Sequence, residues 1–214
     1  MRIENLKMNN SGKLFYKKHT NQKEIALSFD DGPDNIFTPK IIKILKEYKI
    51  HATFFLLGKN IGRNPEIVKE LIKQKHEIGN HSFSHKTLIF KTPKFIKSEI
   101  ERTDLILRES GLGKTQLFRP PYGRYSLALL FILRKMKKKM ILWNIGPKDF
   151  KAKSSNEIIS KIEKKLKPGS IIVLHEKSGE KTIKALNILI PRLLNQKYQF
   201  KTISDLFDFS SSNL

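Results

Sequence analysis

The chain has 214 residues, enough for one domain whose core needs no covalent staples. It contains no cysteine, which excludes disulfides and thiolate metal sites. The 42 Lys and Arg against 20 Asp and Glu give a net charge of +22. This charge favours contact with anionic polymers or membrane surfaces. The lysines are spread along the whole chain, however, so a solvated basic surface is the simpler explanation, and no nucleic-acid-binding motif is apparent.

Residues 1–23 are polar and basic and lack the apolar segment of a signal peptide. We therefore expect a loose lead-in and, by default, a cytoplasmic protein, with export by another route left open. The densest apolar run, residues 127–133, is too short to span a bilayer. Because the basic run 134–139 follows it, this stretch could rest on a membrane surface, although a core helix with a basic end is the simpler prediction.

Apolar runs that end at turn residues predict strands. They are residues 24–29, 52–57, 77–80, 116–118, 140–144, 170–174 and 198–202. Amphipathic stretches between them predict helices, with a left-handed cap at Gly111, an N-cap at Ser155 or Asn156, and a bend at Pro191. These helices are residues 38–49, 65–75, 93–109, 125–137, 156–166 and 182–195.

Strand and helix alternate about seven times, which implies a parallel sheet with right-handed crossovers. With this many units in one small domain, we predict an α/β fold with a closed or nearly closed (β/α) barrel of about seven strands. Neither a repeat nor an internal boundary is visible. The expected organisation is a lead-in over 1–23, one domain over 24–209 and a frayed tail over 210–214.

Unusual polar clusters follow several of the predicted strands, and in a barrel such loops meet at the C-terminal face. Asp30 and Asp31 end the first strand, where a metal ion or a cationic neighbour would relieve the repulsion between two adjacent carboxylates. Taken alone, Asp31-Gly32 is more simply a solvated turn, and the polar clusters after the later strands are what favour a site. His81 and His85 follow the third strand, and if this loop forms one helical turn their i, i+4 spacing lets them share an ion. Two histidines and one carboxylate leave open positions for water and substrate, as hydrolytic metal sites require.

Two further polar residues follow later strands. Arg119 stands before two prolines and is a surface charge or a clamp on a carboxylate, with Asp30 as the candidate partner. His175 ends the predicted strand 170–174 and is a structural histidine or a proton donor. His19, His51 and His76 lack such a setting and are interpreted as surface or structural residues.

Five short motifs, in this order, resemble those of the polysaccharide deacetylases, the NodB-homology domain enzymes of carbohydrate esterase family four. They are Ser-Phe-Asp-Asp-Gly-Pro (28–33), His-Ser-Phe-Ser-His (81–85), Arg-Pro-Pro-Tyr-Gly (119–123), Asp-Phe (149–150) and Val-Leu-His (173–175). The resemblance covers residues 23–207, and five motifs in order are far more specific than any one alone.

The resemblance implies a distorted (β/α) barrel and a divalent metal, usually zinc, with cobalt or nickel as alternatives. Asp31, His81 and His85 would hold the metal. Asp30 would be the catalytic base, and Arg119 would brace it.

The resemblance also assigns roles on the other side of the site. His175 would be the general acid, and Asp149 would orient it and tune its pKa. The backbone N–H of Tyr122 would help to stabilise the oxyanion. Phe150 and Val173 would line the pocket for the acetyl methyl group, where the family usually has tryptophan and leucine.

The expected reaction is hydrolysis of N-acetyl groups on a carbohydrate that contains N-acetylglucosamine, such as a chitooligosaccharide or peptidoglycan, with release of acetate. A small N-acetyl sugar conjugate is an alternative substrate. Two other classes compete: an iron oxygenase, whose sites usually occur on all-β scaffolds, and an inactive basic module that binds an anionic polymer. Gly146, where the family often has an acidic residue, has no interpretation from sequence.

Overall fold

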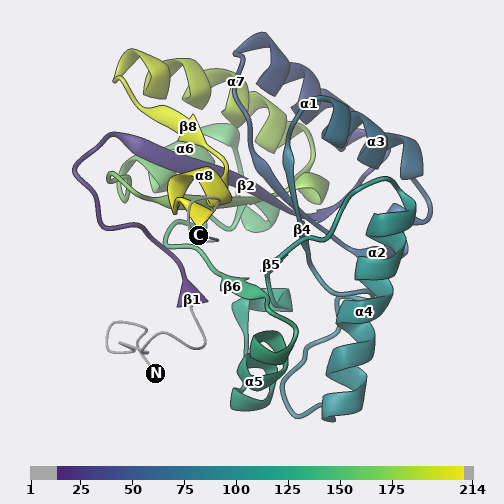
Figure 1. Ribbon diagram of the computed structural model, residues 1–214. Coiled ribbons are helices and arrows are strands. Elements are labelled where there is room, and N and C mark those ends of the chain that lie inside the picture. The colour runs from purple at the N-terminus through teal and green to yellow at the C-terminus, as the bar shows by residue number, and fades with distance from the viewer. Residues whose placement is uncertain (1–13, 210–214) are drawn as a thin grey trace.

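The computed structural model describes residues 14–209, and it shows a strongly curved sheet with helices on its outside (Figure 1). The strands are β1 (Leu14–Phe15), β2 (Glu24–Gly32), β3 (Thr53–Leu56), β4 (Glu77–Asn80), β5 (Leu117–Phe118), β6 (Lys139–Ile141), β7 (Ile171–His175) and β8 (Gln199–Lys201). The α-helices are α1 (Phe37–Glu47), α2 (Gly58–Ile61), α3 (Pro65–Lys73), α4 (Pro93–Glu109), α5 (Leu127–Lys135), α6 (Ser155–Glu163), α7 (Glu180–Asn195) and α8 (Ile203–Leu206). Three single 3₁₀ turns are η2 (Pro121–Gly123), η3 (Asp149–Lys151) and η4 (Glu176–Ser178).

The eight strands form one sheet in the order β1-β6-β5-β4-β3-β2-β7, with β8 paired to the start of β2. Every ladder between these strands is parallel. Two isolated bridges, Lys17 with Ser170 and Ile145 with Ile172, bring the two ends of the sheet together. The predicted α/β fold with a distorted barrel is therefore confirmed, with eight strands in place of about seven.

Side-chain alternation along β2 separates two apolar layers. One set is fully buried and belongs to the large cluster formed with α1, α3, α6 and α7: Ile25, Leu27 and Phe29. Ala26 has the opposite parity and packs inside the sheet with residues of other strands, namely Phe55, Leu117, Ile141 and Ile171. Ser28 and Asp30 share the parity of Ala26, so the polar groups of β2 face the interior of the barrel.

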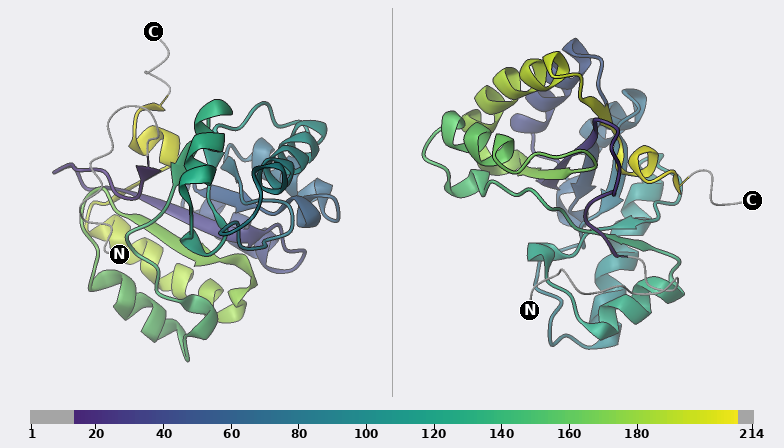
Figure 2. Two further views of the ribbon diagram at one scale, coloured as in Figure 1. Left: turned by 90° about the horizontal axis from the view of Figure 1, so that it is seen from below. Right: turned by 90° about the vertical axis from the view of Figure 1, so that its left-hand side faces the viewer.

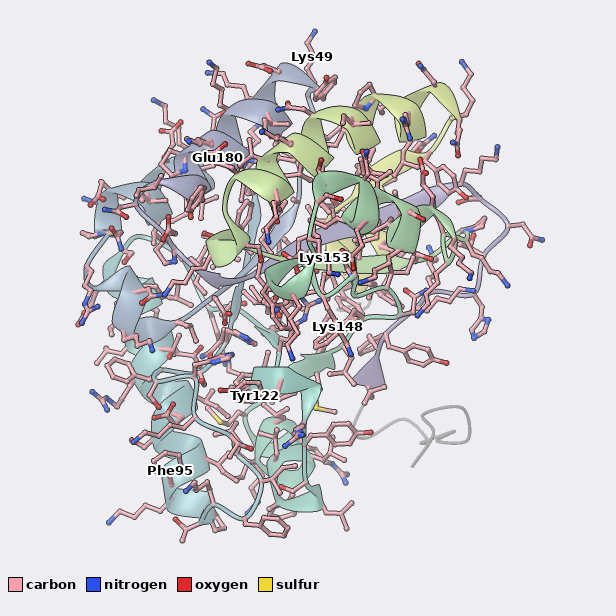
Figure 3. All side chains as sticks on the ribbon, turned by 180° about the vertical axis from the view of Figure 1, so that it is seen from behind. Lys49, Phe95, Tyr122, Lys148, Lys153 and Glu180 are labelled. Atoms are coloured by element: carbon pink, nitrogen blue, oxygen red, sulfur yellow. The ribbon has the colours of Figure 1, made fainter. Side chains whose placement is uncertain are left out.

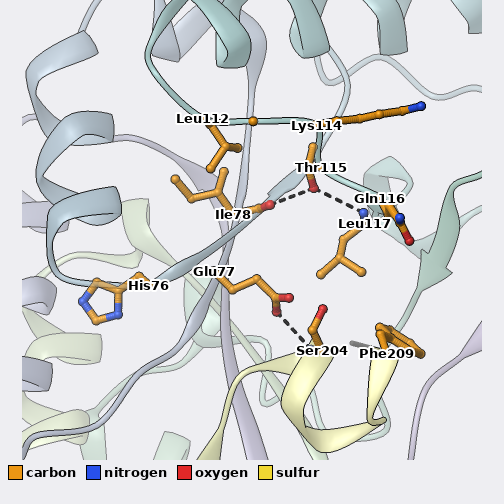
Figure 4. A pocket seen from close by; sticks show the side chains of 11 residues that line it. His76, Glu77, Ile78, Leu112, Lys114, Thr115, Gln116, Leu117, Ser204 and Phe209 are labelled. Carbon is orange, nitrogen blue, oxygen red and sulfur yellow. Dashed lines mark hydrogen bonds between the residues drawn. The ribbon is translucent and has the colours of Figure 1, made fainter. Parts of the chain in front are cut away.

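Helix α8, the yellow helix next to the C-terminus in Figure 2, packs Ile203 and Leu206 against the inner apolar layer. It follows β8, which pairs with the start of β2, so it closes the end of the barrel opposite the carboxyl end of β2. The Glu77 carboxylate accepts N–H bonds from Ile203 at 2.9 Å and Ser204 at 3.3 Å, which caps the first turn of α8. It also accepts the Thr53 hydroxyl at 2.7 Å. A hollow of about 390 Å³ opens beside Glu77 and Thr115 (Figure 4). Since both groups bond within the protein, we interpret this hollow as structural.

Several local predictions are corrected. The lead-in predicted for residues 1–23 is part of the sheet from Leu14 on, because β1 pairs with β6, and residues 1–13 lie outside the described range. The strand predicted for residues 140–144 ends at Ile141, so Trp143 belongs to a loop. The N-cap of α6 is Ser154, whose hydroxyl accepts the Glu157 N–H. Among residues 14–209, no helix has the length and apolar composition needed to cross a membrane.

Candidate active site

The end of β2 carries a bulge that separates the two adjacent carboxylates. Register with β3 shifts between Asp30 and Gly32, and Asp31 adopts a left-handed φ of 74°. The Asn60 side chain holds this conformation by donating to the Asp31 carbonyl at 2.7 Å. Asp30 continues the inward face of the strand and is 2% exposed. The bulge therefore turns two neighbouring residues toward different partners.

Asp30 is paired with Arg119 inside the barrel. Nη1 of Arg119 lies 2.6 Å from Oδ1 of Asp30 and donates to the Ser28 hydroxyl at 2.9 Å. The guanidinium is completely buried. It donates further bonds to the carbonyls of Ile141 and Leu142 and lies over the Phe55 ring, 4.0 Å from its centroid. The contact predicted between Arg119 and Asp30 is thus present, and the guanidinium is rigidly held.

The surroundings of Asp30 keep it ionised. Burial raises its pKa, but the charges of Arg119, His81 and His175 and the Arg119 hydrogen bond outweigh burial, and the net pKa is lowered. A buried carboxylate with a fixed cation on one oxygen can still receive a proton on the other. Its free oxygen, Oδ2, lies 3.8 Å from Nε2 of His81.

The loop after β4 brings His81 and His85 together without a helical turn. Ser82 and His85 have left-handed φ values of 69° and 62°, so the helical turn considered for this loop is wrong. The two imidazole centroids are nevertheless 5.1 Å apart. The Glu99 carboxylate of α4 fixes the loop by accepting the Ser84 N–H at 2.8 Å and its hydroxyl at 2.9 Å.

The tautomer of a neutral His81 follows from its neighbour. Its Nδ1 lies 2.7 Å from the carbonyl of Arg119, which only accepts, so Nδ1 carries the hydrogen. Nε2 is then a bare lone pair, and it faces Oδ1 of Asp31 at 3.5 Å. This is the orientation of a metal-binding histidine whose second nitrogen is hydrogen-bonded to a carbonyl.

Asp31, His81 and His85 meet the requirements of a metal site. One donor atom from each lies within 4.8 Å of the other two. Oδ1 of Asp31 is buried without a hydrogen-bond donor in the described part of the chain, and Nε2 of His85 lies 3.1 Å from it. Two ligands of a tetrahedral ion with bonds of about 2.0 Å lie roughly 3.3 Å apart. The three residues therefore fit a divalent cation.

His175 and Asp149 form a second pair on the opposite side. His175 lies beside Asp30 in the β2–β7 ladder. Its Nδ1 is 2.9 Å from Oδ1 of Asp149, and its backbone N–H donates to Oδ2 at 2.7 Å. Burial lowers the pKa of His175, but the Asp149 hydrogen bond and the charges of Asp30, Asp149 and Asp31 raise it overall. The protonated form of His175 is thereby favoured.

A cleft of about 960 Å³ is lined by Asp31, His85 and His175 and by the other predicted residues. Tyr122, which is labelled in Figure 3, has a φ of 61°, and its ring lies 4.6 Å from that of His85. Its backbone N–H has no acceptor within residues 14–209. Phe150 meets the His175 ring edge-on at 5.0 Å and is half exposed. Val173 is buried in the wall of the cleft.

Gly146 now has an explanation. A Cβ at this position would lie 2.7 Å from Nε1 of Trp143 and 3.3 Å from Cγ1 of Val173. The indole thus fills the space that a side chain at 146 would need. Gly146 and Trp143 both line the cleft.

Glu176 is a buried residue beside the site that sequence reasoning missed. It follows His175 directly, is completely buried, and has Oε1 without a partner among the described residues. Oε2 accepts the Thr38 hydroxyl and, at 3.3 Å, the Asp34 N–H. A Cβ at Gly32 would overlap the carboxyl group, so Gly32 leaves it room. Burial raises the pKa of Glu176 to about 8.

Other missed residues support the site by contacts that are remote in sequence. They are Ser28, Asn60, Glu99 and Thr182, whose hydroxyl lies 3.4 Å from Oδ2 of Asp149. Ser28 is the first residue of the motif 28–33 and Glu176 directly follows the motif 173–175, whereas no local pattern distinguishes the others from surface residues.

Comparison with known proteins identifies the family. The profile described as Polysaccharide deacetylase matches residues 17–141. This chain belongs to the polysaccharide deacetylase family. A peptidoglycan-N-acetylglucosamine deacetylase of Bacillus cereus is 32% identical over 203 residues, which cover 93% of this chain and 95% of that protein. The peptidoglycan-N-acetylmuramic acid deacetylase PdaA of Bacillus subtilis is 32% identical over 196 residues, 90% of this chain and 74% of that protein.

Solved structures agree with this assignment. The Bc1960 peptidoglycan N-acetylglucosamine deacetylase, in complex with an N-hydroxybenzamide, superposes with a TM-score of 0.88 at 32% identity and 92% coverage of both chains. BA3943 of Bacillus anthracis, described as a family-four pseudoenzyme, gives 0.87 at 26% identity, covering 92% of this chain and 70% of that one. The predicted family, fold and enzyme class, a carbohydrate N-deacetylase, are confirmed. Because the fold also occurs in a pseudoenzyme, the roles of individual residues rest on the geometry above.

Proposed function

We propose that this protein is a metal-dependent hydrolase that removes N-acetyl groups from an N-acetylglucosamine-containing or N-acetylmuramic-acid-containing glycan and releases acetate. One observation carries the proposal: Asp31 and His85 of the metal cluster and His175 of the His175–Asp149 pair line one cleft. The ionised Asp30 of the Asp30–Arg119 pair lies directly behind them, beside His175 in the β2–β7 ladder and 3.8 Å from Nε2 of His81. These are a base, a metal site and an acid in the arrangement that amide hydrolysis requires.

Asp31, His81 and His85 would hold the divalent metal, for which zinc is our first choice. When bound, such an ion acidifies water and polarises a carbonyl oxygen. The donor set of two imidazoles and one carboxylate, without thiolate, suits zinc, cobalt or nickel.

Asp30 would accept the proton of the attacking water. Arg119 holds one carboxylate oxygen at 2.6 Å, which fixes the orientation of the other. Because Arg119 is buried and donates to four acceptors, the base is positioned before substrate arrives, which lowers the reorganisation needed in the transition state.

His175 would protonate the departing amine. Asp149 fixes the hydrogen on Nδ1 and favours the cationic ring, so Nε2–H is left to donate toward the cleft. The unpaired Tyr122 N–H is a candidate donor to the developing oxyanion. Phe150 and Val173 would contact the acetyl methyl group.

The glycan substrate is proposed from the relatives, which act on peptidoglycan by name and differ in the sugar they deacetylate. A panel of N-acetylglucosamine oligomers, peptidoglycan and small N-acetyl sugars, with and without added zinc or cobalt, tests it by acetate release. Turnover of peptidoglycan or oligomers supports the proposal. Turnover of small sugars alone would mean that the substrate is a small N-acetyl sugar conjugate. If no substrate releases acetate with metal present, the proposal is refuted.

Two matched variants test the division between the carboxylates. Asp30→Asn keeps the shape and loses the proton acceptor, so it should retain metal and lose nearly all turnover. Asp31→Asn weakens a charged ligand, so it should lose metal affinity and recover part of its activity at high metal concentration. Metal content by elemental analysis, measured beside acetate release, decides the question. Loss of metal from Asp30→Asn but not from Asp31→Asn would reverse the roles.

A further inference from the structure

Helix α5 is apolar on both its inner and its outer side. The inner side is part of a core cluster with α4: Leu129, Leu130, Ile132 and Leu133. The outer side carries Leu127, 81% exposed, and Phe131, 58% exposed. These two residues are four positions apart, so they lie on the same side of the helix. Leu127 and Phe131 therefore form an apolar stripe that is exposed to water and is not part of the core.

Exposed apolar side chains gather at this part of the molecule. Within residues 14–209, seven large apolar side chains are exposed, and two of them, Tyr122 and Phe150, line the cleft. Four others belong to α4, α5 or the loop that leads into α4, which lie side by side in Figures 1 and 3. Phe90 of that loop is fully exposed, whereas Leu88 from the same loop is buried with α4 and α5. Such clustering is unusual for a surface that contacts only water.

The charges on α5 and on the loop that leads into α4 are all positive, and the nearest carboxylates, Glu101 and Asp104, belong to α4 and border a hollow with Lys135. The sequence contains no Asp or Glu in residues 78–98 or 110–148. Exposed Lys91, Lys94, Arg134 and Lys135 form no ion pair within the described residues. The Lys135 ammonium lies over the Phe131 ring, 4.5 Å from its centroid. A cation over a ring that itself faces water gives an apolar surface edged by positive charge.

We propose that this surface, formed by Phe90, Leu127 and Phe131 with Lys91, Lys94, Arg134 and Lys135, docks onto a membrane rich in anionic phospholipid. The apolar tips would enter the interfacial layer, and the cations would contact lipid phosphates. A soluble anionic polymer would bind the cations but would leave the exposed Leu and Phe side chains in water. Leu127 follows the cleft residue Tyr122 by five positions, so docking holds one edge of the cleft close to the membrane.

Vesicle sedimentation measures the partition coefficient directly. Wild-type protein is mixed with sucrose-loaded vesicles of equal phosphatidylglycerol and phosphatidylcholine, or of phosphatidylcholine alone, at 0.1 M salt. We expect binding to the anionic vesicles. Arg134→Gln with Lys135→Gln should weaken it by roughly 25-fold, since each cation near an anionic surface contributes about fivefold.

The apolar part is tested by Leu127→Gln with Phe131→Gln, which should lower the partition coefficient by at least about tenfold. Ile36→Gln is the matched control, because Ile36 is 56% exposed at the start of α1 and should leave binding unchanged. All these side chains are exposed, so the variants should keep the wild-type circular dichroism and acetate release from a soluble substrate.

Insertion is measured with Phe131→Trp and brominated lipids. The native Trp143 lines the cleft, so the wild-type fluorescence provides the baseline, and only the introduced indole should be quenched. Absence of binding to anionic vesicles would refute the proposal. So would binding that Leu127→Gln with Phe131→Gln leaves intact, or binding without quenching, since either is purely electrostatic. Concentration-dependent self-association lost in the same double variant would instead assign this surface to a second copy of the chain.

Discussion

Replacing the buried Glu176 by glutamine should make the protein more stable at alkaline pH and change how its stability depends on pH. Burial raises the pKa of this carboxyl from its ordinary 4.5 to about 8. Between these values the unfolded chain has lost the proton and the folded protein still holds it. Because the folded state binds the extra proton, the contribution of Glu176 to stability is fully present below pH 4.5 and is lost as pH rises toward 8.

The expected size follows from the shift. A rise from 4.5 to about 8 corresponds to about 5 kcal/mol between the two protonation states. Most of it, about 3–4 kcal/mol, is lost between pH 5 and pH 8. Glutamine is neutral at every pH, and its oxygen can still accept from the Thr38 hydroxyl and the Asp34 N–H. The stability of Glu176→Gln relative to wild type should therefore rise by about 3–4 kcal/mol over this range.

Urea unfolding at pH 5, 6, 7 and 8 in chelator, monitored by the single tryptophan, measures the effect. For a slope of about 2 kcal/mol/M, the midpoint difference between the two proteins should grow by about 2 M from pH 5 to pH 8. Glu180→Gln is the matched control, since Glu180 lies on the surface, paired with Lys40, and should change stability by less than about 0.5 kcal/mol at each pH.

Other groups titrate with the opposite sign, and His76 is one of them. Burial lowers the pKa of His76 from 6.5 to about 4, so the unfolded chain binds the extra proton and stability rises with pH between these values. His76 is present in both proteins, so the difference between them isolates Glu176. Parallel stability curves for wild type and Glu176→Gln would refute the reasoning, because they would mean that the carboxyl is already ionised in the folded protein.

Three further predictions concern the site. Chelation should abolish acetate release and added zinc, cobalt or nickel should restore it; full turnover of protein shown to be metal-free by elemental analysis would contradict this. His175→Ala should lower turnover by a factor on the order of 10² or more, mainly in kcat, and flatten the basic limb of the pH profile. An unchanged profile would remove His175 from the mechanism. Asp149→Asn takes away the largest contribution that raises the pKa of His175, so the basic limb of kcat/KM should move to lower pH, and a limb that stays in place would disprove the coupling.

The sequence predicts most of the sheet and its helices because their apolar residues repeat with a clear period. Residues 77–80 and 93–109 have the predicted bounds, and Gly111 has the left-handed conformation expected at the end of α4. The short elements at the chain ends could not be predicted. β1 has two residues and exists because β6 pairs with it, and α8 depends on a Glu77 carboxylate more than a hundred residues away.

In the site, too, residues in local sequence patterns could be predicted, and residues defined by distant contacts could not. Residues that carry chemistry stand in short motifs directly after strands, so sequence order alone brought Asp30, His81, Arg119 and His175 to one face. The groups that hold them do not stand in motifs. Glu176 could be predicted neither as buried nor as protonated, because its partners Thr38 and Asp34 lie after a different strand. Likewise, the left-handed backbone at His85 replaces the helical turn considered from spacing.

The bulge at Asp31 explains how two adjacent aspartates acquire opposite tasks. In a regular strand their side chains would point to opposite faces, and Asp31 would meet the apolar layer that surrounds Phe29. The left-handed φ at Asp31 and the bond from Asn60 to its carbonyl return the second carboxylate to the cleft. Asp30 then pairs with the buried guanidinium of Arg119, and Asp31 lies beside the imidazoles of His81 and His85. Asn60→Ala should thus loosen the metal ligand Asp31 while leaving the Asp30–Arg119 pair intact. Its effect on metal affinity should therefore be larger than its effect on the stability of the barrel.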